Sequence, residues 1–387
     1  MDFSLTLEQE AFREELREFI KANLTPELER EVEREQYALG SLGRVFLKRV
    51  AEKGWLGIGW PKEYGGQGRG AIDQWIFLEE MAAHNLPAGD LTLTSIGPTI
   101  MRVGSEDQKR TYLPSILRVE TIFAAGYTEP GAGSDLASAQ TRAKRDGDTY
   151  VINGQKIYTS AAHYASHIWL LARSDASAEK HRGLSILIVP LDTPGITVRP
   201  LWTMGGERTN EVFLEDVRVP RKSLVGEENR GWYYATMALD FERIIAHNRN
   251  RRHLNHLTRY AKQLVVDGHS LAEDAHVRLV LAKLAVEVEI NRLLVMRNAW
   301  MIEHGLVPNV EASMAKIWGS ELAERIADEA LNIMGPEGLL SAEEQESPIE
   351  GRMERLYRGF PLDKFAGGTN EIQRNIIAQR GLSMPRG

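Results

Sequence analysis

The chain has 387 residues, of which 43% are hydrophobic and 26% charged, so it has ordinary globular composition and enough length for two or three domains. Its formal net charge of −7 argues against nucleic acid or an anionic membrane as the main partner. The absence of cysteine excludes disulfides, thiolate metal ligands and a cysteine nucleophile. No uncharged apolar run reaches the about 18 residues of a membrane span, and the first residues do not resemble a signal peptide, so we expect a soluble cytoplasmic protein.

Residues 1–121 are predicted to form an N-terminal helical domain. Thr6 with Gln9, and Ser105 with Gln108, match the capping box, in which two side chains satisfy free backbone groups at the start of a helix. Thr25-Pro26 offers an N-cap followed by the residue favoured in the first helical turn.

Residues 122–228 are predicted to form a compact β domain, a pair of sheets or a barrel, because short apolar runs here alternate with turn residues. Asn153-Gly154 lies between two such runs and predicts a tight hairpin turn.

Residues 229–387 are predicted to be helical again, since apolar residues recur at three- and four-residue spacing in 232–257, 277–303, 310–334 and 368–380. Long helices of this kind favour a four-helix bundle, which could also pack across subunits. The expected fold class is therefore α+β, with helical, β and helical domains in that order.

The loop 126–135, Gly-Tyr-Thr-Glu-Pro-Gly-Ala-Gly-Ser-Asp, is the most distinctive stretch of the chain. Its three glycines allow positive φ angles and bring backbone amides close to a ligand, while Thr128 and Ser134 add hydroxyl donors. A glycine-rich surface turn is the alternative, because the loop matches neither of the common phosphate-binding patterns.

Glu242 is the candidate general base. On a helix its neighbours three and four residues away are Ala238, Leu239, Ile245 and Ala246, so no ion pair forms along the helix. Burial among apolar residues would raise the pKa of this carboxylate towards neutrality, as a base requires. The alternative is a structural pair with an arginine.

Gly367-Gly368-Thr369 precedes the last predicted helix, and backbone amides at such a helix start attract anionic or carbonyl oxygens. A simply capped terminal helix is the alternative. No His-Glu-x-x-His motif and no Gly-x-Ser-x-Gly elbow occur, so neither a metal site nor a serine hydrolase is expected.

In this order the motifs resemble the acyl-CoA dehydrogenase family, and the resemblance covers almost the whole chain. The matching blocks are 104–109, the loop at 127–135, Asn153-Gly154-Gln155-Lys156, Gly335-Pro336-Glu337-Gly338 and 367–374.

The resemblance implies an oxidoreductase of lipid or fatty acid catabolism, with FAD as cofactor and an acyl-CoA as substrate. The flavin residues that it implies are Ala125, Tyr127, Thr128, Gly133, Ser134, Tyr158, Thr159, Ser160, Thr369 and Glu371. The substrate residues that it implies are Ser134, Arg243, Gly367 and Gly368. Residues 91–101 would line the acyl cavity, and an electron-transferring flavoprotein would be the acceptor.

Most members of the family carry the catalytic glutamate where this chain has Gly367. A minority, similar to isovaleryl-CoA and long-chain acyl-CoA dehydrogenases, carry it on an earlier helix within Leu-Asp-x-Glu-Arg. Residues 239–243 match that pattern, so the resemblance and the apolar neighbours both indicate Glu242 as the catalytic base.

Many members also have an Arg-x-x-Phe-Gly segment whose arginine reaches the flavin of a neighbouring subunit. Residues 265–274 of this chain lack it. The departure is compatible with a homotetramer or with an α2β2 heterotetramer. A partner subunit without activity of its own and a flavin monooxygenase on the same fold are the other interpretations.

Overall fold

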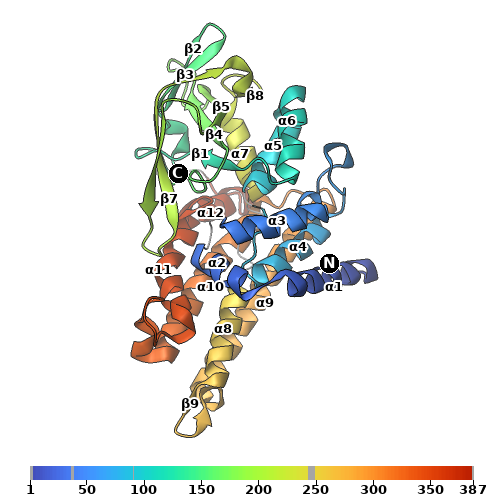
Figure 1. Ribbon diagram of the computed structural model, residues 1–387, viewed down its shortest axis with the longest axis vertical. Coiled ribbons are helices and arrows are strands. Elements are labelled where there is room, and N and C mark those ends of the chain that lie inside the picture. The colour runs from blue at the N-terminus through green and yellow to red at the C-terminus, as the bar shows by residue number, and fades with distance from the viewer. Residues whose placement is uncertain (1–2, 36–38, 90, 243–248, 386–387) are drawn as a thin grey trace.

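The structure is a computed structural model that describes residues 3–35, 39–89, 91–242 and 249–385; the side chains of residues 239–242 are outside this description. Figure 1 shows a β-sheet at one end of the molecule, long C-terminal helices that extend to the other end, and the N-terminal helices beside both. The predicted α+β class, with helical, sheet and helical regions in that order, is confirmed. None of the helices in the described part is long and apolar enough to cross a membrane.

The N-terminal region is built from short amphipathic helices. They are α1 (Leu7–Asn23), α2 (Pro26–Glu35), α3 (Ser41–Glu52), α4 (Ala71–Ala83), α5 (Gly97–Val103) and α6 (Glu106–Leu117). Both predicted capping boxes are present: the Gln9 N–H donates to the Thr6 hydroxyl at 3.2 Å, and the Gln108 N–H donates to the Ser105 hydroxyl at the same distance. Local sequence therefore defines where α1 and α6 begin.

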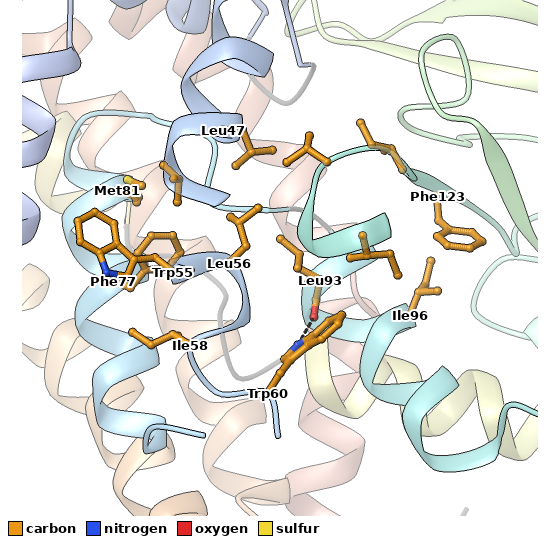
Figure 2. Close-up of a cluster of buried hydrophobic side chains, with 14 of the residues drawn as sticks. Leu47, Trp55, Leu56, Ile58, Trp60, Phe77, Met81, Leu93, Ile96 and Phe123 are labelled. Carbon is orange, nitrogen blue, oxygen red and sulfur yellow. Dashed lines mark hydrogen bonds between the residues drawn. The ribbon is translucent and has the colours of Figure 1, made fainter. Parts of the chain in front are cut away.

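A π-helical segment, Thr92–Ile96, leads directly into α5. Figure 2 shows the apolar cluster around it, in which the indole N–H of Trp60 donates to the Leu93 carbonyl at 3.3 Å. Segments of π-helix are rare and often occur at functional sites. The segment lies within residues 91–101, the predicted acyl-cavity lining.

The central region is one eight-stranded sheet in the order β6-β7-β3-β2-β4-β5-β8, with β1 parallel to β4. Its strands are β1 (Phe123–Gly126), β2 (Arg142–Asp146), β3 (Thr149–Lys156), β4 (His167–Arg173), β5 (Leu184–Pro190), β6 (Ile196–Trp202), β7 (Arg208–Pro220) and β8 (Leu224–Val225). The middle residues of β4 and β5 are buried throughout, so both faces of the sheet are covered there.

The predicted hairpin turn at Asn153-Gly154 is wrong. Both residues lie inside β3, where the pairing with β7 shifts register, and the turn between β2 and β3 is made instead at Gly147, with φ of 58°. The Asn153 side chain donates to the Asp216 carboxylate at 3.0 Å, across the strands. An Asn-Gly pair suits a bulge as well as a turn, and the preceding Asp146-Gly147 pair provides the turn.

The C-terminal region is a helical bundle. Its helices are α7 (Gly231–Glu242), α8 (Asn250–Gln263), α9 (Ala275–Glu303), α10 (Asn309–Met334), α11 (Arg352–Phe365) and α12 (Asn370–Ile376). Side chains of α8, α9, α10 and α11 form a common apolar core. The predicted helices at 277–303 and 310–334 are confirmed, whereas the one predicted over 232–257 includes 243–248, outside the described residues.

Two further elements were not predicted. Between α8 and α9 the chain forms a small hairpin of β9 (Val265–Val266) and β10 (His269–Ser270). The helix α11 was missed because Pro361 inside it interrupts the expected helical pattern.

Candidate active site

The glycine-rich loop follows β1 directly, so the sheet positions it. Within the loop, Glu129 and Ala132 exchange two backbone hydrogen bonds of 3.0 and 3.1 Å. The Thr128 carbonyl accepts from the Ile157 N–H at 2.9 Å, and the Tyr127 hydroxyl accepts from the Trp169 indole at 3.0 Å. The loop therefore has one defined shape and lies against the end of β3.

A buried ion pair beneath the loop fixes this shape. The ammonium group of Lys156, fully buried, donates to Glu129 at 2.8 Å and to the Tyr127 carbonyl at 3.0 Å. The Glu129 carboxylate also accepts from the backbone N–H groups of Gln140 at 2.6 Å and Thr141 at 2.9 Å. Each charge is thus compensated, as burial requires.

Burial and pairing act in opposite directions on these two groups. Burial lowers the pKa of Lys156 to about 8, although the Glu129 charge opposes the shift. Burial alone would raise the pKa of Glu129, but the Lys156 charge and the hydrogen bonds hold it below its ordinary value. Both groups are therefore charged at neutral pH.

The segment 158–160 lies beside the loop through the Ile157 hydrogen bond. Tyr158 has a φ of 56°, and its side chain is 60% exposed. Thr159 is held by Asn210, whose carbonyl accepts from its N–H at 2.9 Å and whose side chain donates to its carbonyl at 3.0 Å. Ser160 is exposed, with its hydroxyl 3.5 Å from that of Thr209.

These residues fit a flavin. The Thr159 hydroxyl is buried and has no hydrogen-bond partner among the described residues, a situation that costs about 1–3 kcal/mol and that a ligand would relieve. The exposed Tyr158 ring offers a flat aromatic wall. Around Gly131 and Gly133 there is open space, so the exposed Ser134 hydroxyl is accessible to a ligand.

The helix α7, which ends at Glu242, is hydrogen-bonded to the π-helical segment Thr92–Ile96. The Ser95 hydroxyl, from the π-helical segment, donates to the Ala238 carbonyl at 2.7 Å. Ala238 is fully buried and lies one turn before Glu242, the last described residue of the helix. The side chain of Glu242 and the whole of Arg243 lie outside the described residues.

The glycine turn at the C-terminal motif has the predicted form. Gly367 and Gly368 have φ angles of 64° and 86°, and the Thr369 hydroxyl caps α12 by accepting from the Ile372 N–H at 3.2 Å. Glu371 is exposed. Across the described ranges, neither Thr369 nor Glu371 bonds to the glycine-rich loop, so their assignment to the flavin stays a prediction.

No metal centre is formed by the described residues, since no group of three or more His, Asp or Glu side chains is arranged to hold an ion. The two histidines that follow the segment 158–160 in the sequence are instead hydrogen-bonded to other side chains. His163 lies 3.2 Å from the Asn210 amide, and His167 lies 2.9 Å from the Ser166 hydroxyl.

Two functional features escaped prediction. The residues of the Glu129–Lys156 pair both belong to quoted motifs, but nothing in the sequence indicates that they meet. Gln373, in the last helix, is fully buried and donates to the Gly367 carbonyl at 3.1 Å. The sequence predicted this helix and its cap, but it gave no signal that the Gln373 amide is buried beyond the place of Gln373 in the motif.

The chain matches three family models in succession. They are the N-terminal, middle and C-terminal domains of acyl-CoA dehydrogenase, matched by residues 6–120, 124–217 and 229–382. Among characterised relatives, the acyl-CoA dehydrogenases FadE26 and FadE29 of Mycobacterium tuberculosis are 39% and 38% identical, over 100% of this chain and 99% of each relative.

Solved structures agree. A structure titled Tcur3481-Tcur3483 steroid ACAD matches with a TM-score of 0.93 and 38% identity, over 100% of both chains. The ChsE4-ChsE5 complex from Mycobacterium tuberculosis matches with a TM-score of 0.90 and 40% identity, again over 100% of both chains. With its three domains matched in order and its fold shared over the full length, the chain belongs to the acyl-CoA dehydrogenase family.

Proposed function

We propose that the chain catalyses the FAD-dependent α,β-dehydrogenation of an acyl-CoA thioester to the trans-2-enoyl-CoA, with Glu242 as the base. The observation that supports this most is the hydrogen bond from Ser95 to Ala238, which ties the helix carrying Glu242 to the predicted acyl-cavity segment. A base must reach the α-carbon of an acyl chain lying in that cavity.

The chain's own residues would hold the cofactor as follows. Thr128 and Ser134 would donate hydroxyl hydrogen bonds, and the Gly133 amide would approach the phosphates. Thr159 would gain the partner that its hydroxyl lacks, and Tyr158 would cover one face of the ring. Ala125, Tyr127 and Ser160 would complete the flavin site. Bound FAD supplies the acceptor for the hydride that leaves the β-carbon.

The glycine turn would bind the thioester carbonyl. A backbone N–H of Gly367 or Gly368 would donate to the thioester carbonyl oxygen. This hydrogen bond polarises the carbonyl group, and the hydrogen on the α-carbon becomes more acidic. Because Gly367 has no side chain, it leaves room at the position where most members of the family carry their base. Glu242 would then remove the α-proton from the α7 side, and Arg243 would contact the substrate.

Exclusion of water is the second role of the protein. The α7 residues Ala235 and Ala238 are fully buried, so water is excluded from the face of the helix on which they lie. A carboxylate at the end of such a helix would have a raised pKa, because desolvation disfavours its charged form. A raised pKa makes Glu242 a stronger base towards a weakly acidic α-hydrogen.

We further propose a bulky, ring-bearing acyl group and a heteromeric assembly. The neighbour at TM-score 0.93 is titled a steroid enzyme, and two neighbours are titled as pairs of different chains. On α9 the residues Leu279, Val286 and Ile290 are 53%, 62% and 36% exposed and lie on one helical face, which also carries the exposed Lys283. A second subunit of the same family would cover such an apolar stripe.

The test is an anaerobic titration of the purified protein, alone and with a second acyl-CoA dehydrogenase-like chain, using straight, branched and steroid-bearing CoA thioesters. We expect flavin absorbance to disappear without added reductant, most readily with the ring-bearing thioester. Retention of the yellow colour with every thioester would contradict dehydrogenation. The physiological acceptor is proposed to be an electron-transferring flavoprotein, which should reoxidise the bleached enzyme.

A further inference from the structure

A row of polar residues on α10 faces the glycine turn. Ser313, Lys316 and Ser320 follow one another at three- and four-residue spacing and therefore share a helical face. All three are buried, as are two amide side chains of α12 that bond to them, Asn370 and Gln373. Such a concentration of buried polar groups is costly unless every group is satisfied.

Gln373 connects this row to the glycine turn. Its side-chain carbonyl accepts from the Ser313 hydroxyl at 2.8 Å, which leaves its NH₂ group to donate in the opposite direction. That group donates to the Gly367 carbonyl at 3.1 Å and approaches the Gly368 carbonyl at 3.4 Å. The glycine carbonyls require the NH₂ end of the amide, and a proton donated by the Ser313 hydroxyl to the side-chain oxygen favours the same orientation.

Lys316 holds the other side of the turn. Its ammonium group donates to the Lys364 carbonyl at 3.0 Å, at the end of α11, and to the Asn370 side-chain oxygen at 2.6 Å. Asn370 in turn accepts from Ser320 at 3.1 Å. Carbonyl groups on both sides of the glycines are therefore drawn towards α10.

Holding carbonyls on one side exposes amides on the other. The C=O of Gly367 and the N–H of Gly368 belong to one trans peptide and point in opposite directions. In the described part of the chain, neither the Gly367 nor the Gly368 N–H donates a hydrogen bond. The positive φ angles of both glycines complete a turn that presents free amides away from α10.

We infer that Gln373, oriented by Ser313, is a positioning residue that fixes the Gly367–Gly368 peptide so that its free N–H faces the thioester carbonyl. The inference rests on the proposed dehydrogenation, in which this carbonyl must be polarised. Gln373 itself touches neither substrate nor cofactor. Its effect is to prevent the flexible glycine pair from rotating the donor away as negative charge develops on the oxygen.

The test uses the assembled, FAD-loaded enzyme with Gln373→Met, which keeps the length of the side chain and removes the donor. The single proton of the Ser313 hydroxyl can then turn to the Asn309 carbonyl, 3.1 Å away, so the change leaves that group satisfied. We expect kcat to fall by about tenfold to a hundredfold, which is less than the about hundredfold to thousandfold effect of removing an oxyanion donor, because here the donor is displaced and not removed. KM should change by less than about threefold, since the donor interacts more strongly with the charged oxygen of the transition state than with the ground-state carbonyl. Gln379→Met, the same change near the end of the chain, should behave as wild type.

The second readout does not depend on turnover. The carbonyl stretch of a bound trans-2-enoyl-CoA, labelled at its carbonyl carbon, should lie below its value in water for the wild type and move back towards that value in Gln373→Met. Unchanged kcat together with an unchanged stretch would overturn the inference. A wild-type enzyme that no thioester reduces, but whose bound thioester shows the Gln373-dependent shift, would overturn the proposed function alone.

If Gln373→Met does not fold, the Ser313→Ala variant tests the positioning role of Gln373 instead. It removes only the hydroxyl that orients the amide, so we expect a smaller fall in kcat, by about threefold to tenfold, with a carbonyl shift in the same direction. Wild-type values of both quantities in Ser313→Ala would contradict the role assigned to Gln373.

Discussion

Replacing Lys156 by methionine tests whether the buried Glu129–Lys156 ion pair stabilises the glycine-rich loop. The substitution keeps the side-chain length and removes the charge that faces Glu129 at 2.8 Å. Removing one partner of a buried pair costs about 3–5 kcal/mol, because the other charge stays buried. Glu129 keeps its two backbone hydrogen bonds from residues 140 and 141, so we expect the lower end, about 3 kcal/mol.

The assay is denaturant unfolding of the loaded enzyme, followed by tryptophan fluorescence, together with flavin release. Trp169 donates to the Tyr127 hydroxyl at the start of the loop and so reports on it. Lys144→Met is the matched control, since Lys144 is exposed on the neighbouring strand β2. Adding Glu129→Gln to Lys156→Met should recover part of the loss, because the uncompensated charge disappears.

Equal unfolding free energies for Lys156→Met and Lys144→Met would refute this reasoning. So would an additive double variant, which would show that the two side chains do not interact.

Three further predictions concern the surroundings of the site. Gly154→Ala should destabilise the sheet by about 1–3 kcal/mol, because its Cβ would lie 2.7 Å from the Thr141 Cα; denaturant unfolding measures this. Ser95→Ala should cost about 1 kcal/mol and slow flavin reduction in rapid mixing, because the last turn of α7 loses the bond to the Ala238 carbonyl. Burial lowers the pKa of Lys316 to about 8 from 10.5, so between these pH values the folded chain has lost a proton that the unfolded chain keeps. The free energy of unfolding should therefore rise with pH over this window. Lys316→Met should remove the Lys316 share of that rise and leave the share of Lys156, whose pKa burial also lowers to about 8.

Local signals in the sequence were sufficient for the boundaries of several helices. The capping boxes at Thr6 and Ser105 and the cap at Thr369 depend on residues three positions apart, so no knowledge of the fold is needed. Asn153-Gly154 shows the limit of such signals. The same dipeptide suits a turn and a bulge, and the pairing with β7, some 60 residues along the chain, decides between them.

The site itself combines residues whose meeting depends on the tertiary fold. Glu129 and Lys156 are 27 positions apart, and Ser313 and Gln373 are 60 apart. A charged or amide side chain in such a motif is equally compatible with exposure to solvent until its partner is known. Glu242 differs, because its apolar helical neighbours are visible in the sequence and predict a desolvated carboxylate.

The central claim is that Glu242 removes the α-proton, and the most direct measurement is anaerobic flavin reduction by the acyl-CoA substrate in Glu242→Gln. The account predicts that this variant keeps its FAD and binds the thioester, while the rate of bleaching falls by at least about a hundredfold, the usual effect of losing a general base. Glu344→Gln, the same change at an exposed residue, should bleach at the wild-type rate. Bleaching of Glu242→Gln at a rate close to that of the wild type would contradict the assignment.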